Sequence, residues 1–175
     1  MANVHLRRLR LAAVLAGLCC AATFLHIPYP MGYLNLGDCL VLLCGAVLPP
    51  LWAMAAAGLG AALADLFLGY ALYAPATLLI KALMALAVGL CCRRKIRALP
   101  ALLGGIIGEV WMILGYFLYE VLLYGTVAAG QNALSVNAPQ AAVNLAVAAV
   151  LFTLLQKSKL LHKMRSGIHY EERTL

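Results

Sequence analysis

The sequence predicts an all-α integral membrane protein with six transmembrane helices and both termini in the cytoplasm. Hydrophobic residues make up 65% of the chain and charged residues 11%, against roughly 25% charged residues in soluble proteins. The mean hydropathy is +0.95. A helical span needs about 20 apolar residues, so 175 residues hold about six short-looped spans. We therefore expect one membrane domain over residues 1–175.

Prolines divide the first half of the chain. A first helix is predicted at about residues 9–25, because the segment HIPYP at 26–30 contains two prolines that forbid continuation. A second, short helix at about 36–48 ends at the next proline pair. A third at about 51–68 is rich in Ala and Gly, a composition that lets helix backbones approach closely.

Three more helices are predicted in the second half, at about residues 75–92, 100–124 and 139–155. The first of them begins with a proline, which is favoured in the first turn. We expect the uncharged polar segment 125–138 to be a loop, and residues 167–175 to be a flexible tail.

The positive charges determine the predicted orientation. Twelve of the 13 Lys and Arg residues lie at the N-terminus, between the fourth and fifth helices, or after the sixth. These places share a side only if six helices cross, and the positive-inside rule makes that side cytoplasmic. Because the cations flank apolar spans, the net charge of +7 indicates a bilayer rather than nucleic acid. We expect a multi-pass protein of a prokaryotic plasma membrane.

The thirteenth cation, Lys81, lies inside the fourth predicted span, and Asp65 lies near the outer end of the third. At a rise of 1.5 Å per residue they are about 9 Å and 6 Å deep. Two interpretations remain open: a structural ion pair between the helices, or side chains that face a ligand cavity open to the outside. Ionisable residues in spans mark functional sites by default.

Two polar stripes extend this hypothesis. Tyr116 and Glu120 share a face of the fifth helix, and Gln140 and Asn144 share a face of the sixth, since residues four apart are neighbours on a helix. Thr77 bears the same relation to the buried lysine. We predict that these residues line one outward-facing pocket. For the amides, hydrogen bonding between helices is the alternative.

The segments before the second helix and within the first carry two further candidates. Asn35 and Asp38 either cap the second helix or contact a ligand. Ala12 and Ala16 form a small-xxx-small pair near the cytoplasmic end of the first helix. Such a pair suits close docking of another helix.

The sequence lacks the motifs of a reaction centre. It contains no GxxxxGK[ST] nucleotide loop, no HExxH and no GxSxG. The six cysteines match no metal-ligand or redox spacing, and we interpret them as apolar filler. We therefore expect no catalytic residue, no metal and no cofactor.

Three segments resemble a known family: PMGYLNLGD after the first helix, GLGAALADLFLGY in the third, and YAPATLLIKALMA opening the fourth. Over residues 9–156 the chain resembles the substrate-binding S components of energy-coupling factor (ECF) vitamin transporters. The similar branch is named for riboflavin transport and includes hydroxymethylpyrimidine and pyridoxine-type carriers.

The resemblance implies a bundle that binds a micronutrient near the outer face, below the first outer loop. It also implies a membrane coupling subunit and two cytoplasmic ATPases as partners, with docking at Ala12 and Ala16. Because only two tryptophans are present and a flavin needs stacking surface, a pyridine or pyrimidine vitamin is the first expectation and riboflavin the second.

Two other function classes compete with this one. A membrane enzyme acting on a lipid or isoprenoid would use Asp65, Glu109 and Glu120, but their spacing is not that of metal ligands. A stand-alone secondary transporter would be expected to show inverted repeats or broken helices, which the sequence does not indicate.

Overall fold

The computed structural model describes residues 2–30, 32–92, 97–160 and 164. In this part of the chain there are six helices and one two-stranded hairpin. The helices are α1 (Ala2–Thr23), α2 (Gly37–Val47), α3 (Pro50–Phe67), α4 (Ala74–Cys91), α5 (Ala98–Tyr124) and α6 (Val127–Lys157), and the strands are β1 (His26–Tyr29) and β2 (Gly32–Asn35). The predicted tail at 167–175 lies outside the described residues.

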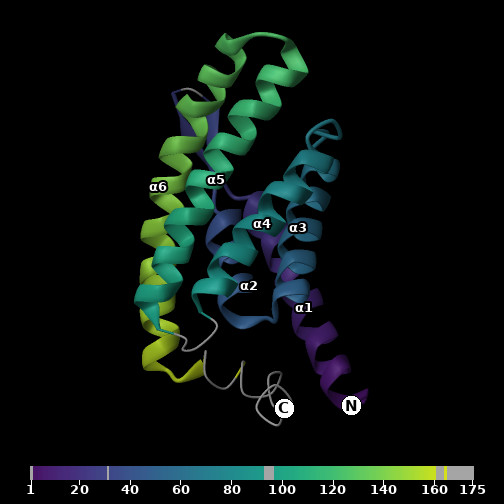
Figure 1. Cartoon of the computed structure of the whole chain (residues 1–175), viewed down its shortest axis with the longest axis vertical. Coiled ribbons are helices and arrows are strands. Elements are labelled where there is room, and N and C mark those ends of the chain that lie inside the picture. The colour runs from purple at the N-terminus through teal and green to yellow at the C-terminus, as the bar shows by residue number, and fades with distance from the viewer. Residues whose placement is uncertain (1, 31, 93–96, 161–163, 165–175) are drawn as a thin grey trace.

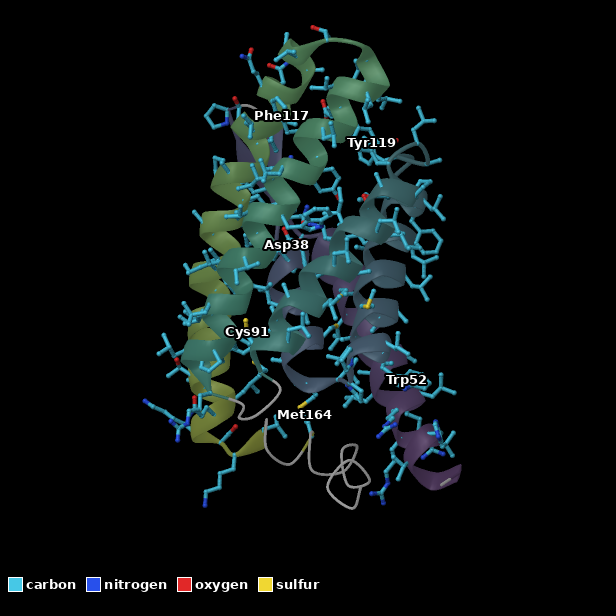
Figure 2. All side chains as sticks on the ribbon, in the orientation of Figure 1. Asp38, Trp52, Cys91, Phe117, Tyr119 and Met164 are labelled. Carbon is cyan, nitrogen blue, oxygen red and sulfur yellow. The ribbon has the colours of Figure 1, made fainter. Side chains whose placement is uncertain are left out.

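The helices form one elongated bundle in which the short α2 lies at the centre (Figure 1). The start of α1 and the end of α6 lie at the lower end, whereas the α3–α4 and α5–α6 connections lie at the upper end. Figure 2 accordingly places Trp52 low in the bundle and Phe117 and Tyr119 high. The arginine-rich start of α1 and the predicted outer connections are therefore at opposite ends, as the charge pattern predicts.

Helix lengths and exposed side chains are those of a membrane protein. Among the described helices, α3 to α6 are long and apolar enough to cross a membrane. Large apolar side chains face outward, including Phe67 at 72% exposure and Leu122 at 73%. Helix α2 has 11 residues, or about 17 Å, and nearly all of them are buried. It fills the centre of the bundle instead of facing lipid.

Small residues allow the helices to pack closely. A Cβ atom added at Gly58 of α3 would lie 2.7 Å from the Leu78 carbonyl oxygen of α4, and one at Gly104 of α5 would lie 2.6 Å from Val88 Cα. Both distances are too short for a side chain, so these contacts require glycine. The Ala- and Gly-rich composition therefore produces the close approach expected of it.

The predicted boundaries hold from α2 to α5, where each helix begins and ends within two residues of the expected position. Two helices are longer than predicted. Helix α1 begins at Ala2 instead of residue 9, since its arginines belong to the helix. Helix α6 begins at Val127 instead of residue 139.

The prediction of a loop at 125–138 is therefore wrong. Local interactions make most of this segment helical. Gly125 ends α5 in the left-handed conformation (φ 68°), and the Thr126 side chain caps α6 by accepting from the Ala128 N–H at 3.2 Å. Gly130 packs against Phe117 of α5. Packing keeps this segment helical and leaves Pro139 inside the helix, where a proline normally costs a hydrogen bond.

The first outer loop, between α1 and α2, is a β-hairpin. Strands β1 and β2 pair antiparallel, with Ile27 opposite Leu34. The prolines of this segment masked the hairpin in the sequence, but a two-stranded ribbon has only edge strands, where proline is tolerated. The hairpin delivers the chain into the start of α2.

Candidate ligand-binding cavity

A cavity of about 590 Å³ opens among α3, α4, α5 and α6. Its lining includes Gly69 and Tyr70 from the α3–α4 connection and Asn132 from the upper part of α6. It therefore lies toward the end of the bundle opposite the start of α1 (Figure 1). Seven of the nine predicted binding residues line it: Asn35, Asp65, Thr77, Lys81, Tyr116, Glu120 and Gln140.

The other two predicted residues, Asp38 and Asn144, are buried behind the wall, at 1% and 0% exposure. Asp38 forms the ion pair with Lys81 and also accepts a hydrogen bond from Gln140 Nε2 at 2.8 Å. Of the two interpretations left open for Lys81 and Asp65, an ion pair between them is not formed, since Lys81 pairs with Asp38, whereas both residues line the cavity. The depth of Asp38 was hidden because α2 starts well inside the bundle (Figure 2).

The amides of α6 hold the hairpin and the start of α2. Gln140 Oε1 accepts from the Asn35 backbone N–H at 3.2 Å and from Asn35 Nδ2 at 3.0 Å. Asn144 Oδ1 accepts from the Cys39 N–H at 2.9 Å, while its Nδ2 donates to the carbonyl oxygens of Asn35 and Gln140 at 2.8 and 3.0 Å. The hydrogen bonds of Asn144 therefore stabilise the fold.

Asn35 does not cap α2 but holds the turn that precedes it. Its Oδ1 accepts from the Gly37 N–H at 3.0 Å, which holds the turn that leads into α2. The same residue lines the cavity. Asp38 stands in the first turn of α2, and no side chain caps that helix.

The inner part of the cavity is formed by α4 and α5. The hydroxyls of Thr77 and Tyr116 are 2.8 Å apart, and the Lys81 ammonium lies 5.4 Å from the centroid of the Tyr116 ring. Thr77 and Lys81 are buried, at 3% and 5% exposure. This part of the cavity offers hydroxyls and an ammonium that is already neutralised by Asp38.

A tyrosine cluster surrounds the outer part. The Tyr73 ring meets Tyr70 and Tyr119 edge-on, with centroids 6.3 and 5.4 Å apart. Its hydroxyl donates to Glu120 at 3.1 Å and lies 3.3 Å from the Tyr124 hydroxyl. Burial, followed by these hydrogen bonds, raises the pKa of Tyr73, so its phenol remains a neutral donor.

Tyr70, Tyr73 and Tyr124 were not predicted as cavity residues. All three line the cavity together with Tyr116. In the sequence, the gathering of tyrosines around the α3–α4 turn and at the end of α5 could have indicated an aromatic site. Trp111, one of the two tryptophans of the chain, is 42% exposed and does not line the cavity.

Two carboxyl groups have buried oxygen atoms without hydrogen bonds in the described part of the chain. Asp65 Oδ2 and both side-chain oxygens of Glu109 are buried without a hydrogen-bond partner among the described residues. Asp65 lines the cavity, whereas Glu109 lies outside the lining and within electrostatic range of Asp38 and Lys81. The described residues contain no cluster of three or more His, Cys, Asp or Glu that could hold a metal ion.

The two alanines predicted for docking lie on the internal side of α1. Ala12 is buried at 6% exposure, and Ala16 packs against α3, where a Cβ atom at Gly60 would lie 3.0 Å from Ala16 Cα. Ala13 and Gly17, each one position later in the helix, are exposed. A Cβ atom at Gly17 would meet nothing within 4 Å.

Comparisons with known proteins agree with this architecture. A protein of Pyrococcus woesei, named "Uncharacterized protein in gap 3'region", is 38% identical over 99 residues, which cover 57% of this chain and 66% of that protein. The solved structure "Structure and mechanism of the S component of a bacterial ECF transporter" matches with a TM-score of 0.65 at 20% identity, over 88% of this chain and 95% of that chain. This likeness shows the shared fold.

The family comparison confirms the resemblance found in the sequence. The model of the family "ECF-type riboflavin transporter, S component" matches residues 3–161, which is nearly the whole described chain. The predicted class, an all-α multi-pass membrane protein with a bundle like that of the S components, is confirmed. The chain belongs to the family of S components of ECF-type riboflavin transporters.

Proposed function

We propose that this chain is a substrate-capture subunit that binds a small, water-soluble vitamin or related heterocycle in the upper cavity. The observation that carries the proposal is the cavity itself. Its volume of about 590 Å³ lies within the roughly 300–1,000 Å³ of small-molecule sites. Hydroxyl, amide and charged groups from four helices converge on it, as expected of a specific ligand site.

Each group has a separate role in this proposal. Thr77, Tyr116 and Gln140 offer hydrogen bonds to the ligand from the lining. Asp38 and Asn144 act through other residues, since Asp38 holds Lys81 and Asn144 holds the chain at Asn35. The cavity is thus organised before the ligand arrives, which lowers the entropic cost of binding.

The ligand we propose is planar and heterocyclic. Four tyrosines on the lining offer aromatic surface, because ring stacking and edge contacts stabilise planar ligands. We propose a pyridine or pyrimidine vitamin as the first candidate. The family that the chain matches is named for riboflavin. The tyrosines offer the stacking surface for a flavin that the two tryptophans alone do not provide. Both ligand sizes therefore belong in the test.

Energy coupling is proposed to come from other subunits, a membrane coupling protein and two cytoplasmic ATPases. The chain contains no nucleotide-binding motif of its own. We propose that docking uses the outward face of α1 around Ala13 and Gly17, because Ala12 and Ala16 pack within the bundle. Small exposed residues allow a partner helix to approach closely.

The direct test is ligand binding by the purified protein in detergent without ATP. Titration with pyridoxine, the aminopyrimidine of thiamine, thiamine and riboflavin, followed by calorimetry, should show saturable one-to-one binding of one compound. Thr77→Val removes one cavity hydroxyl and should weaken that binding by about tenfold, the effect of one lost hydrogen bond worth about 1.4 kcal/mol. Absence of binding to every compound would contradict the proposal.

A further inference from the structure

We propose that the ligand of this cavity is an organic cation, a heterocycle that carries a protonated or quaternary nitrogen. The inference rests on the proposed function, since it assumes that the upper cavity is the ligand site. It goes further by assigning the charge of the ligand. Three features of the cavity support it: the charge balance, an uncompensated carboxylate and the tyrosine cluster.

The charge balance of the lining is negative. Asp65 and Glu120 contribute two carboxylates, and Lys81 is the one cation on the lining in the described part of the chain. Lys81 is already paired with Asp38, which lies behind the wall. The pair is neutral as a unit, so two carboxylates face the cavity without a counter-charge among these residues.

Asp65 is the less compensated of the two. Its Oδ2 is buried and has no hydrogen-bond partner among the described residues. The Thr77 hydroxyl and the Lys81 ammonium both act on Asp65 and partly stabilise its charge, but Lys81 is already paired with Asp38, so Asp65 has no counter-ion of its own among the described residues. An uncompensated carboxylate in an apolar bundle is costly, and a bound cation would offset that cost.

The tyrosine cluster suits the same ligand. Tyr70, Tyr73, Tyr116 and Tyr124 line the cavity, and aromatic faces attract ammonium and ring cations through the ring quadrupole. Glu120 lies within this cluster because the Tyr73 hydroxyl donates to it at 3.1 Å. Aromatic rings combined with a nearby carboxylate form a site that favours a cation with an apolar body.

The same features disfavour an anion. Helix α4 begins at Ala74 next to the cavity, and helix N-termini ordinarily attract negative groups. Tyr73, its N-cap residue, instead donates to Glu120, so a carboxylate of the protein already lies beside this helix end. A phosphate or carboxylate ligand would meet two like charges and no free cation among the described lining residues.

The test compares matched ligands that differ in charge. Pyridoxamine, pyridoxine and 4-pyridoxate share one ring and carry a cationic, neutral and anionic substituent at the same position; thiamine and riboflavin extend the series to a larger cation and a larger neutral compound. Calorimetry at pH 7, with competition for weak ligands, should rank pyridoxamine above pyridoxine and pyridoxine above 4-pyridoxate. The tightest compound of the whole panel should be a cation.

Charge variants make the same measurement specific to the cavity. Asp65→Asn and Glu120→Gln should each weaken the cationic ligand by about tenfold and leave pyridoxine nearly unchanged. Asn137→Asp, which adds a carboxylate to the lining, should strengthen cation binding. Gln131→Glu adds the same charge at an exposed position of the same helix outside the lining, and it should alter affinity less than about twofold.

The outcomes separate this inference from the proposed function. If riboflavin or an anion binds most tightly, and the two amide variants bind as well as the unmodified protein, the charge assignment is overturned and the capture function stands. If no compound binds, the proposed function is contradicted and this inference with it.

Discussion

Among single residues, Lys81 and the nearby carboxylates of Asp38 and Asp65 are central to the site. Lys81 is 5% exposed and Asp38 1%, so each charge depends on the other. Losing one partner of a buried pair is far more costly than losing both. The sequence identified Lys81, Asp65 and their similar depth, but not Asp38 as the partner, because pairing depends on where α2 starts in the bundle.

Replacing one member of this pair should therefore be worse than replacing both. We expect Lys81→Met to lower the stability of the protein by about 3 kcal/mol, because Asp38 remains buried without its cation. The double variant Asp38→Asn with Lys81→Met should recover much of that loss. Thermal unfolding in detergent measures both. A double variant no more stable than Lys81→Met would show that the two residues are not coupled.

Glu109 presents the opposite case. It is 2% exposed and both its oxygens lack a hydrogen-bond partner among the described residues. We expect Glu109→Met, which keeps the volume and removes the polar group, to raise the melting temperature, since an unsatisfied buried carboxylate destabilises the fold by about 1–3 kcal/mol or more. A lower melting temperature would show that the carboxylate stabilises the bundle.

At the scale of elements, the cavity wall depends on contacts between α6 and the hairpin that no local pattern reveals. Periodicity placed Gln140 and Asn144 on one face of α6 and predicted that they would meet other helices. It did not show that their partners are Asn35 and the backbone at the start of α2. These bonds join residues about 105 positions apart, so only the fold brings them together.

Asn144 is accordingly expected to act through the hairpin and not through the ligand. Asn144→Ala removes hydrogen bonds to Cys39 and Asn35 and should lower both the melting temperature and ligand affinity. Asn137 also lies on α6, nearer its start, and lines the cavity. Asn137→Ala should therefore change affinity without changing stability. Equal melting temperatures for the two variants would contradict the structural role of Asn144.

Helix α1 offers a similar separation of faces. Gly17→Leu projects a bulky side chain into open space and should leave ligand binding intact while abolishing uptake in cells that express the energising subunits. Ala12→Leu adds volume to the core and should lower the melting temperature by overpacking. Normal uptake by Gly17→Leu would place the docking surface elsewhere.

At the scale of the whole molecule, the sequence predicted the class, the orientation and most helix boundaries because these follow from hydropathy and from the placement of arginines and lysines. It also predicted seven residues that line one cavity. Five of them followed from residues four apart on a helix sharing a face, whereas Asp65 followed from its charge within a span and Asn35 from its place before α2. It missed the hairpin, the upper half of α6 and the tyrosine cluster. Prolines concealed the hairpin, and the start of α6 depends on its cap and on the packing of Gly130 against Phe117 of α5. The tyrosine cluster forms only where the α3–α4 connection meets the end of α5.

If the upper cavity captures the ligand, a bulky side chain that fills this cavity should prevent binding. Ala133 on α6 is 5% exposed and lines the cavity, whereas Ala146 on the same helix is exposed on the outside of the bundle. Calorimetry with the tightest compound of the panel should show that Ala133→Trp abolishes binding and Ala146→Trp preserves it, with both proteins unfolding cooperatively. Undiminished binding by a folded Ala133→Trp variant would show that the ligand binds outside this cavity.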